Sequence, residues 1–411
     1  MRDSMPASID VIGVGESGRA SLSTPALEAL SRAEVIIGGK RHHKLAGHCA
    51  AQRVLWPSPF SKMIGELAEH GGRRVAVIVT GDPLWYSAGA LIARQWPREL
   101  VRFHPQISAF QLACCRMKWS LADVETLTVH GRPAEEILPW LSPGSRLVVL
   151  TANADSPAEI SRLLVEHGYS GSRLTVLGAL GGKHETRMAG IAGRWSEVQA
   201  NSRVPDFHTL CIECEADADR DVLPRGPGLP DDAFATDGNY TKGEVRAITV
   251  CALRPGRGKL LWDIGCGHGT VAIEWMRAGR DARAVGIERN AKRAEMARRN
   301  AKRLGAPRLD IRIAEASEVV ATLPPPDSIF IGGGLTRRLA EQCLSRLGGH
   351  GRIVANAVTL ESQQTLSSLH MVHGGELVNI AISHCMPIGS HRGWKPQRPV
   401  VQWRLSQCLA N

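Results

Sequence analysis

The sequence predicts two α/β domains joined by a polar linker, and three observations lead to this fold class. Short apolar segments alternate with amphipathic segments of helical period through most of the chain. The length of 411 residues fits two or three domains of roughly 150 residues each. A stretch rich in Asp, Pro and Gly at 215–232 interrupts the alternation and has no apolar period. We therefore place one domain at 5–214, a linker at 215–231 and a second domain at 232–411.

The first domain contains candidate strands that are short and rich in Val, Ile and Leu, as buried strands are. The pattern does not indicate in which order these strands lie in a sheet. The candidate strands are 9–14, 34–38, 74–80, 101–104, 146–150, 174–178 and 209–213.

The second domain is predicted to be a Rossmann-like, doubly wound sheet of seven strands, because helical segments lie between most of its strands. In such sheets ligands bind beyond the carboxyl ends of the strands. The predicted strands are 259–264, 284–288, 310–314, 328–332, 352–358, 377–384 and 400–405, and the predicted helices are 270–278, 290–304, 336–347 and 360–370.

The composition is that of an ordinary globular protein, with 43% hydrophobic and 22% charged residues. No apolar run approaches the ~18 residues that a membrane span needs, and the N-terminal MRDSMPASID has no apolar signal-peptide core. Without a secretory signal, the ten cysteines are interpreted as reduced thiols. We expect a cytoplasmic protein with no membrane partner.

The positive charge lies entirely in the second domain. Residues 232–411 carry 25 Lys and Arg against 15 Asp and Glu, whereas residues 1–231 carry 25 of each, so the net charge of +10 belongs to the second domain. This favours either a nucleic-acid partner or a small polyanionic substrate. The segment 289–312 alone holds nine basic and two acidic residues. Because its helix covers a face of the sheet, we interpret most of these charges as a solvated surface.

A glycine-rich loop follows the first strand of the second domain, in the segment LWDIGCGHGT at 261–270. A dinucleotide-binding loop needs its third glycine at position 270, where Thr270 stands. The pattern D-x-G-x-G-x-G is typical of loops that bind the methionine part of S-adenosylmethionine (SAM). The next strand ends at Glu288, whose carboxylate can accept the ribose hydroxyls, and the third strand precedes the expected adenine site. The predicted cofactor-binding residues here are Asp263, Gly265, Cys266, Gly267, His268, Gly269, Glu288, Ala314, Glu315 and Ala316.

A second glycine-rich loop, VIGVGESG at 11–18, matches G-x-G-x-x-G letter for letter. A nicotinamide site would also need an acidic residue at the end of the next strand. That strand ends in Gly38-Gly39-Lys40, so we do not predict a nicotinamide site.

Metal binding is not predicted. Cys211 and Cys214 form a single C-x-x-C pair in a predicted strand, where residues three apart point to opposite faces. His42, His43 and His384 lack the spacing of metal ligands. His391 and its neighbour Arg392 are candidates for the border of the second-domain cleft.

The first domain resembles the tetrapyrrole methylase family over most of residues 8–214. In that family the Gly-Asp-Pro turn lines a SAM cleft, so the resemblance implies a second SAM site that includes Gly81, Asp82, Pro83 and Ser108. The matching stretches are VIGVGESG (11–18), IIGGKRHH (36–43), TGDPLWYSAG (80–89), HPQISAFQLACCRMKW (104–119) and VHGRP (129–133).

The second domain resembles class I methyltransferases that act on the same tetrapyrrole, and the two domains in this order resemble a family of fused corrinoid methyltransferases. The resemblance implies a bifunctional enzyme that uses two SAM molecules and no metal. It implies methylation of precorrin-6Y at C5 by the first domain and at C15 by the second, with loss of CO2 from the C12 acetate, giving precorrin-8 in aerobic cobalamin biosynthesis. The matching stretches are DGNYTKGEVRA (237–247), LWDIGCGHGTVAIE (261–274), GIERN (286–290), DSIFIGGG (327–334) and NAVTLES (356–362).

Candidate residues for the substrate pocket come from these matching stretches. Thr241 is a candidate SAM contact, but it also has the spacing of a capping box with Glu244. Glu244 and Arg246 have an alternative role as an ion pair on a helix surface. No proton donor or acceptor can be assigned from the pattern. The catalytic candidates are Glu244, Arg246, Asn356 and Glu361, with Asp237, Lys242 and Thr359 as further pocket candidates.

The expected partner is therefore a small polyanionic tetrapyrrole rather than nucleic acid, and we expect the protein to form a homo-oligomer. The alternative is a SAM-dependent RNA methyltransferase with an accessory domain, which only the basic helix favours. The segment 327–334 lacks the Asn/Asp-Pro-Pro-aromatic sequence with which such enzymes usually hold a planar base. A non-catalytic SAM-binding or tetrapyrrole-carrier protein is the third possibility.

Overall fold

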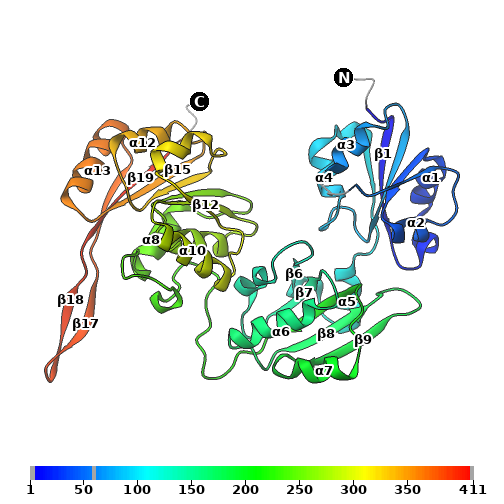
Figure 1. Cartoon of the computed structure of the whole chain (residues 1–411), viewed down its shortest axis with the longest axis horizontal. Helices are drawn as coiled ribbons and strands as arrows, with labels where there is room; N and C mark the ends of the chain where they lie inside the picture. The colour runs from blue at the N-terminus through cyan, green and yellow to red at the C-terminus, as the bar shows by residue number, and fades with distance from the viewer. Residues whose placement is uncertain (1–4, 58–61, 408–411) are drawn as a thin grey trace. The chain divides into compact units, whose positions relative to one another are not determined.

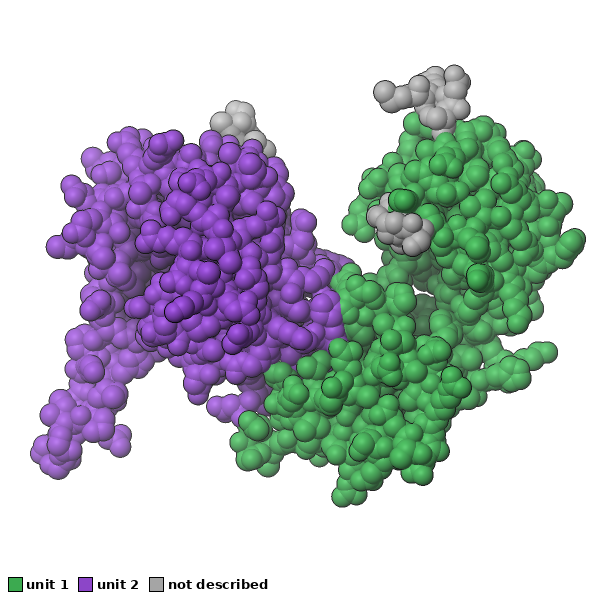
Figure 2. All heavy atoms as spheres, in the orientation of Figure 1, with its two compact units in different colours: residues 1–132, 142–220 green, residues 133–141, 221–411 purple. Residues whose placement is uncertain are grey.

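The computed structural model describes residues 5–57 and 62–407. The chain separates into two compact units (Figure 2): unit 1 comprises Met1–Arg132 and Ser142–Arg220, and unit 2 comprises Pro133–Leu141 and Asp221–Asn411. Within the described ranges, none of the helices combines the length and the apolar character that a bilayer span requires.

Unit 1 begins with a parallel sheet in the order β3-β2-β4-β1-β5 (Figure 1). Both faces of its strand β1, which lies between β4 and β5, are buried: Ile9 and Val11 contribute to one apolar cluster, and Ile12 and Val14 to another. The strands are β1 (Ser8–Val14), β2 (Val35–Gly38), β3 (Gln52–Leu55), β4 (Arg74–Thr80) and β5 (Val101–His104), and the helices are α1 (Thr24–Arg32), α2 (Lys40–Ala46), α3 (Met63–Ala68) and α4 (Gly89–Gln95).

A second, mixed sheet completes unit 1 in the order β6-β7-β10-β8-β9. Only the β6–β7 pair is parallel among its described strands. Phe110, Val148 and Leu177 pack on one of its faces. Its strands are β6 (Glu125–Thr128), β7 (Arg146–Leu150), β8 (Arg173–Gly178), β9 (Thr186–Ile191) and β10 (His208–Glu213), and its helices are α5 (Ala109–Met117), α6 (Ser156–Glu166) and α7 (Trp195–Asn201).

Unit 2 contains the predicted seven-stranded sheet, in the order β13-β12-β11-β14-β15-β19-β16. Strand β19 is antiparallel to both of its neighbours, while the other pairs are parallel. The strands are β11 (Leu260–Ile264), β12 (Arg283–Glu288), β13 (Asp310–Ile313), β14 (Ser328–Ile331), β15 (Arg352–Ala357), β16 (Glu376–Ile380) and β19 (Val400–Ser406). The helices are α8 (Gly243–Leu253), α9 (Thr270–Ala278), α10 (Ala291–Arg303), α11 (Ala316–Val319), α12 (Arg337–Leu344) and α13 (Leu360–His373).

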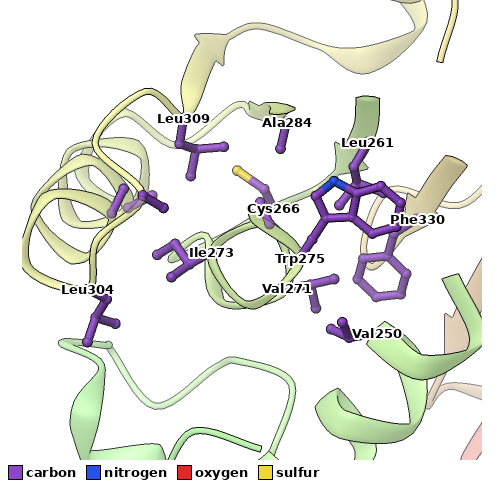
Figure 3. Packing of buried hydrophobic residues seen from close by; sticks show 14 of the residues in the cluster. Val250, Leu261, Cys266, Val271, Ile273, Trp275, Ala284, Leu304, Leu309 and Phe330 are labelled. Carbon is purple, nitrogen blue, oxygen red and sulfur yellow. The ribbon is translucent and has the colours of Figure 1, made fainter. Parts of the chain in front are cut away.

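The core of unit 2 supports the carboxyl ends of its central strands. Figure 3 shows Val250 of α8, Trp275 of α9 and Phe330 of β14 lying together, and all three are buried. Burying side chains of this size stabilises a fold by about 1.5–3 kcal/mol each. The glycine loop after β11 is therefore anchored on a densely packed base.

A hairpin replaces part of one predicted strand. The predicted strand at 377–384 is wrong in its second half, because β16 ends at Ile380 and a new strand begins at Ser383. Strands β17 (Ser383–Ile388) and β18 (His391–Pro396) form a two-stranded arm outside the main sheet (Figure 1). All residues of β17 are exposed, so this strand is held by pairing with β18 and not by burial in the core.

The segment predicted as a linker is bound to the two units rather than free. In unit 1, Asp217 Oδ1 accepts hydrogen bonds from Ser170 N at 3.0 Å and Ser170 Oγ at 2.7 Å. In unit 2, the carboxylate of Glu274 accepts from Gly228 N at 2.9 Å and Leu229 N at 3.0 Å. The chain passes from unit 1 to unit 2 between residues 220 and 221, and the earlier segment Pro133–Leu141 also belongs to unit 2. Composition showed that 215–231 lacks regular structure, but side-chain hydrogen bonds hold it in place.

Candidate functional site

A cavity of about 970 Å³ opens beside the carboxyl ends of the strands of unit 2, where doubly wound sheets bind ligands. Its volume lies at the upper end of the range for small-molecule sites. It brings together most of the residues predicted for the second domain. The predicted residues that line it are Thr241, Lys242, Asp263, Gly265, Cys266, Gly267, His268, Glu288, Ala314, Glu315, Ala316 and Asn356.

The three glycines of the loop have different roles. Gly265 has φ +66°, and a Cβ there would lie 2.8 Å from Gly333 N. A glycine is therefore needed here so that the loop can pack closely against the backbone of Gly333. Gly267 has φ +55° and nothing within 4 Å of a Cβ position, so it leaves space in the cavity wall for a ligand. Gly269 is the N-cap of α9 with φ +76° and is not part of the cavity lining.

Glu288 holds the glycine loop against the end of β12. Its Oε2 accepts a hydrogen bond from Gly267 N at 2.9 Å, and its Oε1 accepts from Asn290 N at 2.8 Å. The side chain is only 6% exposed but borders the cavity. The carboxylate predicted for ribose binding therefore also fixes the loop that shapes the site.

Asp263 has a buried oxygen without a partner. Its Oδ2 accepts from Ala272 N at 3.0 Å, but its Oδ1 has no hydrogen bond within the described residues. Burial raises the pKa of this carboxyl to about 7, and the negative charge of Glu288 acts in the same direction. A buried acceptor beside a cavity is complementary to a cationic donor. We expect the ammonium group of SAM, whose methionine part is predicted above to bind this loop, to meet this oxygen.

His268 offers a second unsatisfied atom. In the neutral ring, Nε2 lies 3.2 Å from Asp237 N and 3.4 Å from Asp237 Oδ1, and Nδ1 is buried and without a partner among the described residues. Burial lowers the pKa of His268 and favours this neutral form. Asp237 itself lies outside the cavity lining, where its carboxylate is 2.7 Å from Arg293 Nε. Among the described residues, the cavity wall thus contains one unpaired carboxylate oxygen and one unpaired ring nitrogen.

The raised pKa of Asp263 predicts a pH dependence for SAM binding. Pairing with an ammonium group requires the carboxylate, so below pH 7 binding must release a proton from Asp263. We expect the affinity of unit 2 for SAM to fall about tenfold for each pH unit between pH 7 and pH 5. Calorimetry at several pH values measures this, and an affinity that stays constant down to pH 5 would contradict it.

The hairpin supplies cavity residues that sequence reasoning missed. Lys395 and Arg398 line the cavity, together with His384 and Met386. Their only sequence signal is a cluster of basic residues at 392–398, which has no meaning until β17 and β18 pair. His391 and Arg392, predicted for the cleft border, lie toward the other end of the hairpin, opposite Ile388 and Pro387, and do not line the cavity. Other missed lining residues are Tyr240, Arg289, Arg293, Gly332, Gly333 and Gly334.

Arg246 lies in the core and not in the cavity lining. It has no exposed surface; its Nε is 2.6 Å from Glu274 Oε1, and its Nη1 is 3.0 Å from Asp231 Oδ1. The predicted surface pair of Glu244 and Arg246 is therefore wrong. Because an uncompensated buried charge is very costly, this arginine requires all of its partners, and its role is to anchor the segment before α8.

Glu244, Thr359 and Glu361 also lie outside the cavity lining. Glu244 is exposed and 3.4 Å from His384 Nε2. Thr359 is the N-cap of α13 and accepts from Ser362 N, and Glu361 lies in the first turn of that helix. The predicted capping box of Thr241 is wrong, because α8 begins after Lys242 and no side chain caps it in the described structure.

In unit 1 a small cavity of about 30 Å³ lies beside the predicted Gly-Asp-Pro turn. Gly81 lines it with φ +63°, and Thr80 and Phe207 form part of its wall. Asp82 and Ser108 have local structural contacts instead: Asp82 Oδ1 accepts from Leu84 N at 2.7 Å, and Ser108 caps α5. Pro83 is buried next to this turn. Of the four predicted residues, the structure places Gly81 alone in the cavity lining.

The basic segment 289–312 is largely paired. Eight of its nine Lys and Arg residues contact a carboxylate or a main-chain carbonyl. Examples are Arg308, whose Nε is 2.5 Å from Glu136 Oε1, and Arg312, which pairs with Asp310. Many of these pairs are on the surface, as expected for a solvated face, and surface ion pairs contribute only about 0–1 kcal/mol each.

The predicted reduced state of Cys211 and Cys214 fits their surroundings. Both thiols are free and buried, and burial raises the pKa of Cys211 to about 12, so both are protonated at neutral pH. The described residues contain no group of three or more potential metal-ligating side chains.

Comparison with known proteins identifies both halves of the chain. Residues 9–193 match the family Tetrapyrrole (Corrin/Porphyrin) Methylases, and residues 232–407 match the family Precorrin methyltransferase domain. The crystal structure of the C-terminal domain of precorrin-6Y C5,15-methyltransferase from Rhodobacter capsulatus is 45% identical, covers 45% of this chain and 100% of that chain, and has a TM-score of 0.43.

Two curated relatives extend over nearly the whole chain. A precorrin-6Y C(5,15)-methyltransferase [decarboxylating] from Sinorhizobium sp. is 40% identical and covers 96% of this chain and 95% of its own length. A protein of the same name from Mycobacterium tuberculosis (strain ATCC 25618 / H37Rv) is 35% identical and covers 97% of this chain and 100% of its own length. The chain therefore belongs to the family of decarboxylating precorrin-6Y C(5,15)-methyltransferases of cobalamin biosynthesis.

Proposed function

We propose that the protein converts precorrin-6Y to precorrin-8 on the aerobic route to cobalamin, with one SAM site in each unit. Unit 2 methylates C15 and removes CO2 from the C12 acetate, and unit 1 methylates C5. The observation that carries this proposal is the cavity of unit 2, where the unpaired oxygen of Asp263 lies beside the glycine loop. The names of the curated relatives supply both positions of methylation and the decarboxylation.

The residues of unit 2 divide the cavity into two halves. Asp263 and His268 would hold the methionine part of SAM, and Glu288 the ribose, because these side chains lie at or just after the carboxyl ends of β11 and β12. SAM supplies a methyl group bound to a positively charged sulfur. Asn356, Lys395 and Arg398 come from β15 and the end of the hairpin, on the other side of β11 from β12. The second half is therefore left for the tetrapyrrole.

The main task of the protein in methyl transfer is to hold the reacting carbon of the tetrapyrrole in line with the methyl group of SAM. Such positioning supplies a large part of the rate in two-substrate reactions, and no protein nucleophile is required. Lys395 and Arg398 provide positive charge for the carboxylates of the tetrapyrrole. For the decarboxylation, the conjugated macrocycle accepts the electrons of the breaking carbon–carbon bond, and a proton taken up from solvent completes the methyl group left at C12.

In unit 1, we place the proposed SAM site at the turn around Gly81 and Thr80; the cavity of about 30 Å³ there has room for about one water molecule, so SAM binding requires its walls to move apart. A Cβ on Gly13 would lie only 2.1 Å from Gly81 O, so the first glycine loop packs directly on the Gly-Asp-Pro turn. This contact explains why both sequence signals occur together. The carboxylate of Asp82 stabilises the turn and is not expected to touch SAM.

Mass spectrometry of the products tests the two-site proposal. The full chain, incubated with SAM and precorrin-6Y, is expected to add two methyl groups and remove one CO2. Glu288→Ala is expected to slow C15 methylation roughly 10- to 100-fold, since it removes hydrogen bonds of a charged group. Asp82→Ala is expected to slow only C5 methylation and to release a decarboxylated product without the C5 methyl group.

Circular dichroism must show that both variants are folded. If both folded variants lose the same methyl group, the division of labour between the units is wrong. A parallel incubation with RNA tests the alternative substrate, and methylation of RNA instead of precorrin-6Y would overturn the proposal.

A further inference from the structure

A chain of polar side chains runs from β19 to the wall of the unit 2 cavity. Arg404 Nε donates to Gln402 Oε1 at 2.6 Å, and Gln402 Nε2 donates to Asn356 Oδ1 at 2.8 Å. Thr249 Oγ1 accepts from Gln402 Nε2 and from Asn356 Nδ2, each at 3.0 Å, and donates to Val245 O at 2.7 Å. Gln402 and Thr249 have no exposed surface. Of the residues joined by these hydrogen bonds, only Asn356 and Val245 line the cavity.

The hydrogen bonds in this chain have one direction. An arginine has only donors, so Gln402 must turn its oxygen toward Arg404 and its NH2 group toward the other two partners. The hydroxyl proton of Thr249 is used by Val245 O, so the hydroxyl oxygen can only accept from the two amides. Asn356 must therefore point its oxygen at Gln402 and its nitrogen at Thr249. The reverse orientation would place two NH2 groups against each other and an oxygen against the lone pairs of Thr249.

One N–H of Asn356 is left over by this arrangement. Its Nδ2 has two hydrogens, and only one is used, by Thr249. Strand β19 runs antiparallel to β15 with Ala357 opposite Val401, so the residues just before Val400 lie beside the carboxyl end of β15. Arg398 is one of these residues and lines the same cavity. The wall around Asn356 therefore offers hydrogen-bond donors and positive charge, a combination that suits a carboxylate.

We propose that Asn356 donates this N–H to a carboxylate of the tetrapyrrole, and that Arg404, Gln402 and Thr249 are positioning residues that fix its amide in the donating orientation. The inference rests on the function proposed above, because it places the tetrapyrrole in this half of the cavity. It adds to that function a set of buried and half-buried side chains that orient the Asn356 amide. Three side chains thus fix the orientation of the amide that makes a single contact.

Steady-state kinetics of the full chain with precorrin-6Y and SAM test the proposal. Asn356→Ala and Gln402→Leu are each expected to lower kcat/KM for C15 methylation roughly 10- to 100-fold, the size of a hydrogen bond to a charged group. The effect should appear in the KM for precorrin-6Y, while the affinity for SAM stays within about twofold of the parent. Gln402→Glu should be as harmful as Gln402→Leu although it keeps the shape. A carboxylate has no N–H to donate to Asn356 Oδ1, so the Asn356 amide must rotate by about 180° and lose its donating orientation.

Gln407 provides the matched control. It follows β19, and its Nε2 donates to Leu344 O away from the cavity, so Gln407→Leu should leave the kinetics unchanged. If Gln402→Leu does not fold, Arg404→Met can be used instead. It removes the N–H donor that orients Gln402, at the half-buried end of this row of hydrogen bonds, and is expected to lower kcat/KM about tenfold.

A double variant separates orientation from stability. In the Asn356→Ala background, Gln402→Leu should add less than about twofold, because the group that it positions is gone. An equal loss in both backgrounds would overturn the proposal, and so would a parental kcat/KM in folded Asn356→Ala. If the unmodified chain converts no precorrin-6Y at all, the proposed function fails, and this inference fails with it.

Discussion

Replacing Asp263 with Asn is expected to abolish tight SAM binding in unit 2 without damaging the fold. The Asn oxygen can still accept from Ala272 N, as Asp263 Oδ2 does. The other atom becomes an NH2 group that faces the ammonium of SAM where a carboxylate oxygen stood. Losing one partner of a buried charged pair costs about 3–4 kcal/mol, which corresponds to an affinity loss of roughly 10²- to 10³-fold. Calorimetry with SAM measures this directly.

The same variant should be at least as stable as the parent when no ligand is bound. Because burial raises the pKa of Asp263 to about 7, the folded protein retains a proton that the unfolded chain has lost above pH 4. The contribution of Asp263 to stability is therefore present at low pH and is lost as pH rises to 7. The neutral Asn avoids this loss, so its advantage in thermal unfolding should grow between pH 4 and pH 7. A variant that unfolds at a lower temperature throughout this range would show that Asp263 is structural.

A fragment of unit 2 that begins at residue 232 is expected to be much less stable than one that begins at residue 221. The shorter fragment lacks Gly228 and Leu229, whose main-chain N–H groups pair with Glu274, and it lacks Asp231, a partner of Arg246. Each buried polar group left without its partner costs about 1–3 kcal/mol, and the loss of the buried Leu229 side chain adds about 2 kcal/mol. For a domain of this size, the sum lowers the melting temperature by roughly 10 °C or more.

Thermal unfolding of the two fragments measures the difference, and both lack 133–141 equally. Replacing the buried ion pair in both fragments, with Arg246→Met and Glu274→Leu together, provides the control. Apolar side chains need no polar partners, so the gap between the two fragments should shrink. If the two fragments with the native ion pair unfold within about 2 °C of each other, the contacts of 221–231 contribute little to the stability of unit 2.

The fold was predictable where strands are buried. All seven strands predicted in unit 1 are present, because apolar runs such as 74–80 mark strands in the interior of a sheet. The three strands that were missed, β3, β6 and β9, all lie at sheet edges. The side chains of β3 and β9 are mostly exposed, so selection for buried apolar residues leaves little trace there. An edge strand forms because it pairs with a neighbouring strand, and the local sequence pattern holds no information about that neighbour.

The candidate site was predictable only where its geometry is local. The glycine loop and Asp263 are encoded within a few residues, because the loop must turn sharply and leave space for a ligand. Whether Arg246 faces a cavity or the core depends on Glu274, which is 28 residues away. Lys395 reaches the cavity from β18, which pairs with β17, and Arg398 follows β18. Long-range contacts of this kind leave no signal in the spacing of residues.

The position of β19 also determines when unit 2 can fold. This strand is the last of the seven in sequence, but it lies between β15 and β16 in the sheet, and its Trp403 is completely buried. During synthesis the other six strands emerge first, and β15 then has an edge that only β19 can complete. A nascent chain at that stage exposes unpaired strand edges and apolar surface, which promote aggregation. We therefore expect chaperone dependence and misfolding to concentrate in the interval between the synthesis of β16 and that of β19, which the hairpin of β17 and β18 lengthens.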